Sequence, residues 1–249
     1  MDFEQWAKGQ SILHGASPHL KIVGAVCFCF SLATCQQIQA ALAGLLLACG
    51  GVLLARIPLM SLLKRLLFVN IFTLVCWLTL PVTVSGTTIG HFWFLSISRE
   101  GMAMALLISV KTNGLVLAFI SLIGTSSIAD LGHGLSRLQT PKKLCLLLLF
   151  SYRYIFVIHD EYKRLKRAAI FRSFKPTTSM HTYKTYGNLL GMTLVKGWQR
   201  AGRVQEAMLL RGFSGQFISL GYPNTCRTDW LILTTVLSCT CLVLAFEYW

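Results

Sequence analysis

Long apolar runs are the feature that most restricts how this chain of 249 residues can fold. A helix needs roughly 20 apolar residues to cross the hydrocarbon core of a bilayer, with a range of about 17–25. Four runs meet this requirement, and a fifth is shorter but has flanking residues that extend it. They are Ile38–Ala55, Leu66–Val84, Met102–Gly124 and Trp230–Phe246, with Ile22–Cys35 as the shorter one. The sequence therefore predicts an all-α integral membrane protein with about five transmembrane helices.

Charge then predicts the orientation of these spans. The chain is 54% hydrophobic and only 13% charged, whereas soluble domains carry about a quarter charged residues. Its net charge of +14 is concentrated, because twelve Lys or Arg and three acids lie between His159 and Thr228. Such a block is typical of the cytoplasmic side of a membrane protein. We therefore expect a cytoplasmic N-terminus, an external C-terminus and an external loop at Ser85–Gly101.

The apolar stretch Leu144–Ile158 is ambiguous, because it is short for a span and contains Arg153. If it crossed the membrane, the block of twelve cations would lie outside, against the positive-inside rule. We expect instead a helix at the cytoplasmic face, with Arg153 reaching the interface, although a sixth crossing stays open. The expected organisation is a lead-in with four spans in residues 1–125, cytoplasmic helices in 126–228 and a last span in 229–249.

A short unit occurs twice inside the basic block. The two copies are Ala168-x-x-x-Arg172-Ser173-Phe174 and Ala207-x-x-x-Arg211-Gly212-Phe213. In a helix, residues four apart share one face, so each unit sets a small side chain beside an arginine, with a turn residue and an aromatic next. This pattern favours a helix end that docks into another protein. Chance repetition in a basic chain, and binding of the cations to anionic lipid, are the alternatives.

Helices are expected throughout the block, with a break at Pro176. The second helix is predicted from about Tyr186 to Leu210 and is amphipathic. One face carries the basic residues together with an alanine, and the opposite face is apolar. The first face holds Lys196, Arg200, Arg203, Ala207 and Arg211, and the second holds Leu194, Val195, Trp198, Ala201, Met208 and Leu209. The apolar face is expected to pack on the membrane bundle, which leaves the cationic face for a partner.

No pattern in the sequence indicates catalysis or metal binding. The nine cysteines form no C-x-x-C, the histidines lack helical ligand spacing, and there is no P-loop or H-E-x-x-H. No metal site or cofactor is predicted, and ATP hydrolysis by this chain is not expected. Lys111 and Asn113 lie inside a predicted span, where polar groups are functional candidates. Structural and functional roles for these two residues stay equally open.

At this point the residues resemble a family, the transmembrane (T) component of energy-coupling factor transporters, also called the CbiQ/EcfT family. Gln10–Lys21 resembles its opening, S-x-L-H-x-x-D-P-R-x-K, with Ser17 and His19 in place of the usual Asp and Arg. Ile128–Leu138 with Pro141 is similar to the segment before the coupling helices, and the repeat resembles the two Ala-Arg-Gly coupling motifs, with Ser173 where Gly is usual. Ser151–Phe156 followed by Asp160 and Glu161 resembles the cobalt and nickel branch.

The resemblance implies a non-catalytic subunit of a bacterial or archaeal plasma membrane, which couples two cytoplasmic ATP-binding-cassette ATPases to a substrate-specific membrane subunit. Metal ligands would then lie on that substrate subunit, and no nucleic acid is involved. The implied ATPase-coupling residues are Ala168, Arg172, Ser173, Ala207, Arg211 and Gly212, and the supporting residues are Arg153, Glu161, Arg200 and Arg203. The alternatives are a vitamin importer of the same kind, an intramembrane enzyme using Lys111, Asn113 and His133, and a stand-alone channel.

Overall fold

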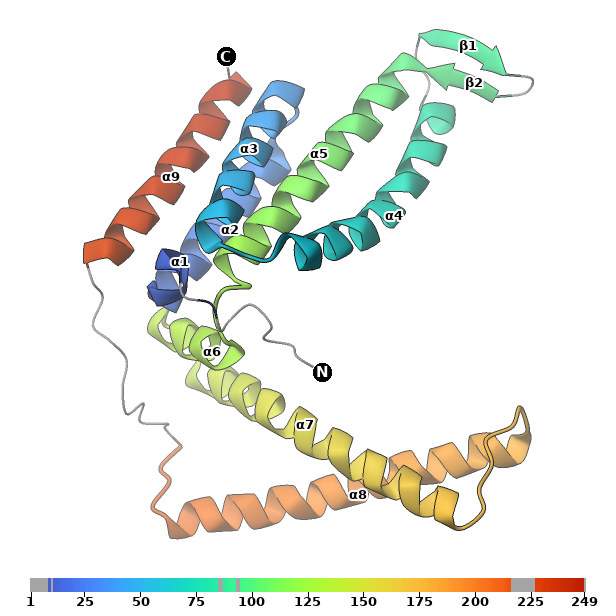
Figure 1. The fold of residues 1–249 in the computed structure, drawn as a ribbon. Helices are drawn as coiled ribbons and strands as arrows, with labels where there is room; N and C mark the ends of the chain where they lie inside the picture. Colours follow the sequence, from blue (N-terminus) through green and yellow to red (C-terminus); the bar gives the residue numbers. More distant parts are fainter. Residues whose placement is uncertain (1–8, 10, 85–86, 93–94, 216–226, 249) are drawn as a thin grey trace. The chain divides into compact units, whose positions relative to one another are not determined.

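The structure is a computed structural model that describes residues 9, 11–84, 87–92, 95–215 and 227–248. These residues fold into two compact units (Figure 1). The membrane unit comprises Met1–Leu138 and Pro223–Trp249, and the coupling unit comprises Gln139–Tyr222. The second unit is therefore inserted into the sequence of the first, and two chain connections join them.

Every apolar run predicted to span the membrane is helical in the membrane unit. Three helices, α3, α4 and α5, are long and apolar enough to cross a bilayer, and the apolar helices α2 and α9 are shorter. The helices of this unit are α1 (Ile12–Gly15), α2 (Pro18–Thr34), α3 (Ile38–Ala55), α4 (Leu59–Thr83), α5 (Arg99–Leu122), α6 (Ile128–Arg137) and α9 (Arg227–Tyr248). The all-α membrane fold with about five apolar helices is confirmed.

A two-stranded hairpin is the one departure from an all-helical chain within the described residues. Strands β1 (Thr88–Phe92) and β2 (Leu95–Ser98) pair antiparallel in the predicted external loop between α4 and α5. The second strand leads directly into α5, whose N-cap residue Ser98 accepts a hydrogen bond from the Gly101 N–H at 3.0 Å. Capping by a serine side chain satisfies one free donor of the first turn, which places the start of α5 at Arg99.

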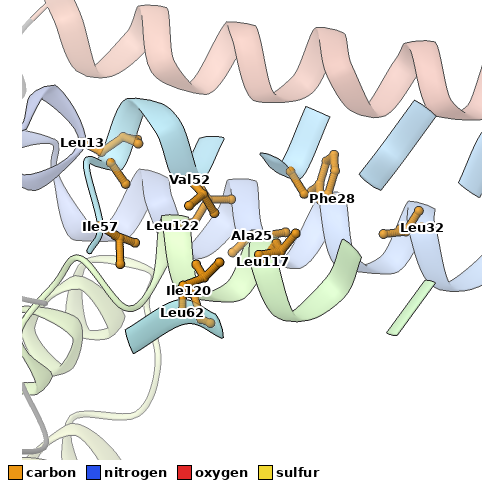
Figure 2. Close-up of a cluster of buried hydrophobic side chains, with 13 residues drawn as sticks. Leu13, Ala25, Phe28, Leu32, Val52, Ile57, Leu62, Leu117, Ile120 and Leu122 are labelled. Carbon is orange, nitrogen blue, oxygen red and sulfur yellow. The ribbon is translucent and has the colours of Figure 1, made fainter. Parts of the chain in front are cut away.

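The core of the membrane unit forms where α2, α3 and α5 pack together, with α9 against α2 and α3 and α4 against α5 (Figures 1 and 2). Leu32 of α2 is fully buried and fits between Gly44 of α3 and Gly114 of α5. A Cβ at Gly114 would lie only 2.9 Å from the Leu32 side chain. Glycines here let the backbones approach closely, which is how apolar helices associate in lipid without a hydrophobic driving force.

The coupling unit consists of two long antiparallel helices that cross, α7 (Lys142–Phe171) and α8 (Met180–Leu210) (Figure 1). The ambiguous stretch Leu144–Ile158 is the first half of α7, which is not among the candidate spans. Helix α8 begins six residues before the predicted Tyr186, because Ser179 acts as its N-cap and accepts from the Thr182 N–H.

Candidate functional site

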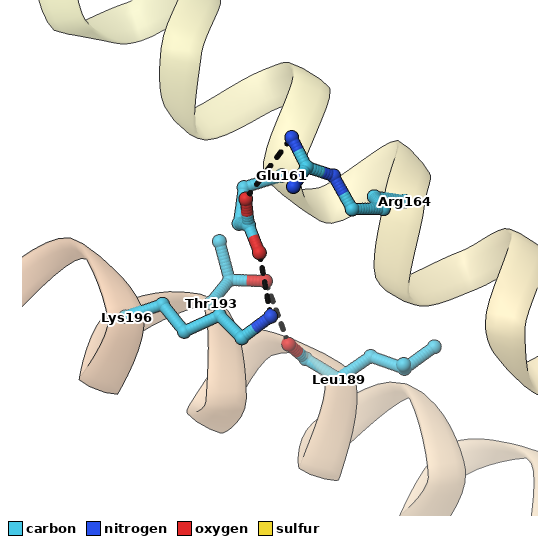
Figure 3. A network of polar contacts seen from close by, with 5 residues as sticks. All are labelled: Glu161, Arg164, Leu189, Thr193 and Lys196. Carbon is cyan, nitrogen blue, oxygen red and sulfur yellow. Dashed lines mark hydrogen bonds and ion pairs between the residues drawn. The ribbon is translucent and has the colours of Figure 1, made fainter.

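One buried carboxylate holds the crossing of α7 and α8 together (Figure 3). Glu161 of α7 is only 8% exposed and accepts a hydrogen bond of 2.6 Å from the Lys196 Nζ of α8. Arg164, one turn further along α7, lies 3.7 Å from the other oxygen of Glu161. The hydrogen bond from Lys196 lowers the pKa of Glu161, with further help from the charges of Arg164 and Arg200 against the opposing effect of burial. The carboxylate is therefore ionised at neutral pH.

The first repeat unit forms the C-terminal cap of α7. Arg172 is the C-cap residue, and Ser173 follows it in the left-handed region with φ 63°. The Ser173 N–H donates to the Ile170 carbonyl at 3.0 Å, and the Phe174 N–H donates to the Ala169 carbonyl at 3.1 Å. This pair of bonds defines a Schellman motif, which satisfies the last carbonyls of a helix and turns the chain away sharply. Arg172 is therefore held at the tip of a rigid helix.

The second repeat unit builds the same cap at the end of α8. Arg211 is the C-cap residue, and Gly212 follows it in the left-handed region with φ 75°. The Gly212 N–H donates to the Leu209 carbonyl at 2.9 Å, and the Phe213 N–H donates to the Met208 carbonyl at 3.0 Å. Each hydrogen bond matches its counterpart at α7 within 0.1 Å. The sequence repeat is thus a structural repeat, in which an arginine stands at the same position of the same helix end.

Both tips also present a bare apolar side chain next to the arginine. The last helical residues are Phe171 and Leu210, and they are 87% and 90% exposed. Arg172 and Arg211 are exposed as well, as are Ala168 and Ala207 one turn earlier. Arginine is enriched at the energetically important positions of protein interfaces, and each tip sets one beside an exposed apolar side chain.

The aromatic residue of each unit faces the partner helix. Phe174 packs edge-on against Tyr186 of α8, with ring centroids 5.8 Å apart, and also lies near His181. Phe213 lines an apolar groove that α7 shares with the C-terminal half of α8. The cap of α7 is therefore fixed to α8 through Phe174, and Phe213 places the cap of α8 beside the groove.

The apolar groove has a volume of about 670 Å³ and lies wholly within the coupling unit. Aromatic residues of α7, Phe150 and Tyr154, form one wall, and the small residues Gly197 and Ala201 lie on the α8 side. A Cβ at Gly197 would meet no atom within 4 Å, so the groove stays open at that point. A concave surface of this size and polarity suits an apolar ligand or an apolar helix of a partner.

The structure separates the four predicted supporting residues. Glu161 is buried at the crossing, and Arg200 is half-buried and lines the groove. Arg153 and Arg203 are exposed on α7 and α8. The helical wheel assigns the cationic face of α8 to a partner, but Lys196 of that face binds Glu161 of α7, and Arg200 lines the groove shared with α7. Of the opposite face, Leu194 and Trp198 are 74% and 83% exposed.

Sequence reasoning missed the partner of Glu161 and the role of the two phenylalanines. Lys196 had been placed on the cationic face of α8, but nothing local connects it with an acid 35 positions earlier. The phenylalanines were visible within the repeat, and their position directly after the turn residue is the one that a Schellman motif fills with an apolar contact. That signal was available from the sequence.

The polar residues inside the apolar helices bind other parts of the membrane unit. Lys111 Nζ donates to the Ala33 carbonyl in the last turn of α2 at 3.0 Å, where a cation favours the helix dipole. Asn113 and Asn70 exchange side-chain hydrogen bonds between α5 and α4, at 3.0 and 3.2 Å. Both polar groups thus support packing. His133, the third residue of the enzyme alternative, lies on α6.

The described residues hold no group of three or more His, Cys, Asp or Glu side chains that could bind a metal ion. The geometry of the coupling unit suits the transmission of movement. Two long helices cross at an ion pair, and each ends in a stiff, cationic and partly apolar tip. Such an arrangement can transmit a displacement applied at the tips.

Comparison with known proteins bears on this arrangement. The family model described as CbiQ, cobalt transport protein, matches residues 9–220. The energy-coupling factor transporter transmembrane protein EcfT of Brevibacillus brevis is 29% identical over 85% of this chain and 84% of its own length. EcfT of Macrococcus caseolyticus is 25% identical over 94% of both chains. An uncharacterized protein of Methanocaldococcus jannaschii, MJ1089, is 24% identical over 71% of this chain and 66% of its own length.

Proposed function

Because the chain belongs to the CbiQ cobalt transport protein family, we propose that it couples ATP hydrolysis to the import of cobalt or nickel ions. Membership makes it the non-catalytic transmembrane component of an energy-coupling factor transporter and a multi-pass protein of the plasma membrane. In the proposed complex, two cytoplasmic ATP-binding-cassette ATPases hydrolyse ATP, and a separate membrane subunit captures the ion. The chain described here connects these partners.

The observation that carries this proposal is the duplicated helix tip. Two ATPase subunits need two equivalent docking elements, and the coupling unit offers two helix ends with the same cap. Arg172 and Arg211 are exposed, each beside a bare hydrophobic residue. A guanidinium group has five donors in a fixed fork, suited to carboxylates and backbone carbonyls in a partner groove. The ATPase-coupling residues are then Ala168, Arg172, Ser173, Ala207, Arg211 and Gly212.

The groove between α7 and α8 is the proposed binding site for a helix of the substrate-binding subunit. Its walls are almost entirely apolar, and Gly197 and Ala201 leave room for another helix. Small residues of this kind allow close packing of a membrane helix. A shift of the two tips changes the crossing at Glu161 and Lys196 and so reshapes the groove. Arg200, at the groove wall, and the exposed Arg153 and Arg203 are proposed to support this movement.

The proposed orientation places the N-terminus and the coupling unit in the cytoplasm. Twelve Lys or Arg against three acids between His159 and Thr228 support this orientation, because basic loops stay on the cytoplasmic side. The ATPases would meet both tips there.

Charge reversal at a tip tests the docking role. Arg211→Glu should abolish uptake and remove the ATPases from the purified complex, while the chain still inserts into the membrane. A carboxylate in place of the guanidinium would be repelled by the oxygen acceptors of the ATPase that bind the arginine. Loss of a buried charged contact costs about 2–5 kcal/mol of binding free energy. The measurement is copurification with a tagged ATPase, together with uptake in cells. Arg172→Glu should behave alike.

Lys143→Glu supplies the matched control, since it reverses an exposed charge at the opposite end of α7. It should retain the ATPases. Normal uptake by Arg211→Glu, or equal losses for Lys143→Glu, would show that the tips do not dock.

The substrate is tested separately. In a strain lacking this chain, accumulation of Co²⁺ and Ni²⁺ should fall while vitamin uptake is unchanged, because the chain's family is described by cobalt transport. A defect in vitamin uptake with normal metal accumulation would assign the same coupling role to a vitamin importer, as the broader name of the EcfT relatives allows.

A further inference from the structure

Both chain connections between the two units leave from helices that contact the start of α2. The first connection follows α6, which ends at Arg137 just before the coupling unit begins at Gln139. The second precedes α9, which begins at Arg227 soon after the membrane unit resumes at Pro223. Any displacement of the coupling unit that travels along the chain therefore reaches the membrane unit through α6 and α9.

Helix α6 rests on the first turn of α2 almost backbone to backbone. A Cβ at Gly134 would lie 3.0 Å from the His19 nitrogen and 3.1 Å from Pro18, so only glycine fits this approach without a shift. In the loop just before α6, the Ser126 hydroxyl accepts a hydrogen bond of 2.9 Å from Lys21 Nζ. Lys21 is only 2% exposed. This first connection is thus fastened to α2 by close packing and by a buried charge.

Helix α9 is fastened to the same turn from its own first turn. Asp229 accepts a hydrogen bond of 2.5 Å from the Ser17 hydroxyl and another of 3.2 Å from the Ser17 N–H. Asp229 is 5% exposed, and Ser17 is the N-cap residue of α2. Hydrogen bonds to a buried carboxylate are strong and are costly to break, because the charge is then left unsolvated. The start of α9, at which the second connection ends, is therefore also fixed to α2.

The C-terminal end of α9 provides a comparison, because a carboxylate there is also hydrogen-bonded to a neighbouring helix. Glu247 accepts from the Gln36 and Gln37 N–H groups at 2.8 and 3.1 Å, at the start of α3. The chemistry is the same, a carboxylate of α9 bound to the start of a neighbouring helix. These bonds lie in exposed surroundings, however, and no connection to the coupling unit leaves from this end.

We propose that the first turn of α2, Ser17–Lys21, is the relay through which movement of the coupling unit enters the membrane helices, with Asp229, Lys21 and Gly134 as positioning residues. The inference rests on the proposed coupling function and names the point of transmission. Because α6 and α9 both contact this one turn of α2, the turn is displaced only when both helices act on it together. Helix α2 packs against α3, α5 and α9 and carries the displacement into the core.

Hydrogen–deuterium exchange of the complete transporter tests the relay without needing the transported ligand. The complex purified with its ATPases is compared with and without ATP and Mg²⁺. In the wild type, ATP should change exchange both at the tips (residues 172–174 and 211–213) and in residues 17–21. In Asp229→Asn the tips should respond as before, but the response of residues 17–21 should be lost. ATP hydrolysis should continue, and Co²⁺ uptake in proteoliposomes should fall by about tenfold, the scale of one buried charged hydrogen bond.

Three further variants separate transmission from mere stability. Glu247→Gln removes the equivalent fastening at the other end of α9 and should keep the response of residues 17–21. The double variant Ser17→Asp with Asp229→Ser places the carboxylate on α2 and the hydroxyl on α9. It should restore the response of residues 17–21 to ATP. Gly134→Ala disturbs only the contact between α6 and α2, and this variant should lose the response of residues 17–21. These three also decide the matter if Asp229→Asn does not assemble.

The relay is overturned if residues 17–21 do not respond to ATP while the tips do. It is equally overturned if Asp229→Asn or Gly134→Ala responds like the wild type, if Glu247→Gln loses as much as Asp229→Asn, or if the double variant shows no recovery. If the wild-type tips themselves ignore ATP and no ATPase copurifies, the coupling function fails, and the relay fails with it.

Discussion

The two helix tips have the same backbone and different residues at its most demanding position. Both end in the same pair of hydrogen bonds, and both place a residue at positive φ after the arginine. At the end of α8 that residue is Gly212, which tolerates the conformation freely. At the end of α7 it is Ser173, whose Cβ makes the left-handed conformation cost roughly 1–2 kcal/mol. The left-handed conformation is therefore favourable for the residue at the end of α8, whereas at the end of α7 it needs support from surrounding contacts.

Tertiary contacts account for the difference. The chain after Ser173 turns directly into α8, and Phe174 is held between His181 and Tyr186 of that helix. The cap of α7 is thus supported on both sides by the coupling unit itself. At the end of α8, Gly212 itself tolerates the positive φ, so this cap depends more on its own residue. One tip is therefore stabilised by the loop that follows it, and the other by its glycine.

Breaking the ion pair at the crossing of α7 and α8, which positions both tips, should have the largest effect on ATPase binding and uptake. Glu161→Lys would set two cations against each other at the crossing of α7 and α8, where Lys196 lies 2.6 Å from the present carboxylate. Both tips should lose their relative position, and ATPase copurification and uptake should be abolished together. The exchanged pair, Glu161→Lys with Lys196→Glu, restores opposite charges and should recover most of both. Loss at only one tip, seen by crosslinking to each ATPase, would mean that the crossing does not connect them.

The exposed apolar residues should have the next largest effect. Leu210→Ala and Phe171→Ala each remove a side chain that is almost fully exposed in the free chain and proposed to be buried in an ATPase. Each should weaken ATPase binding by about 2 kcal/mol, a factor of roughly 30. Titration of the purified chain with ATPase subunits measures this change. Leu194→Ala, at an exposed apolar position in the middle of α8, should leave the affinity unchanged, and an equal loss there would show that the tips have no special role in binding.

Exchange of the turn residue tests the comparison between the tips directly. Gly212→Ala should destabilise the end of α8 by about 1 kcal/mol, because alanine at φ 75° is strained. Ser173→Gly should do the opposite at α7 and gain about 0.5–1 kcal/mol, since the strain is relieved at some entropic cost. Thermal unfolding of the purified chain and hydrogen exchange at each tip report both changes. Equal and opposite shifts are not required, but effects of the same sign would contradict the assignment of strain to Ser173.

The smallest effect concerns pH. Since the folded state lowers the pKa of Glu161 through the hydrogen bond from Lys196, the stabilising contribution is fully present above the ordinary glutamate pKa of about 4.3. It is lost as the pH falls through the lowered folded value. Acidification should therefore reduce the unfolding temperature of the wild type more than that of Glu161→Gln. Parallel acid curves for the two proteins would show that the pair contributes nothing to stability.

Much of the fold was predictable because its signals are local. Ile38–Ala55 was predicted as a span and forms α3 with the same bounds, since an apolar run of this length has few alternatives. The two caps were predictable for the same reason, because a Schellman motif is written within seven consecutive residues. The hairpin at 88–98 and the early start of α8 at Met180 were missed, because a loop of mixed residues and a serine after a proline read as irregular chain.

The contacts that position the candidate site were beyond reach of the sequence. Lys196 and Glu161 are 35 residues apart, and Asp229 and Ser17 are 212 apart. The helical wheel assigned Lys196 and Arg200 to an outside partner, whereas Lys196 binds Glu161 of α7 and Arg200 lines the groove within the coupling unit. A periodic pattern shows which residues share a side, and packing decides what that side meets.

By itself, then, the amino-acid order determined that this chain is a helical membrane protein with two arginine-tipped helix ends, since hydropathy, capping and turn conformation act over one or two turns of chain. Only the tertiary structure decided which charges are buried in pairs, that α7 and α8 cross at Glu161, and that α6 and α9 both grip the first turn of α2. Those contacts join segments far apart in sequence, and their free energy depends on solvent exclusion that arises only when the helices have packed together.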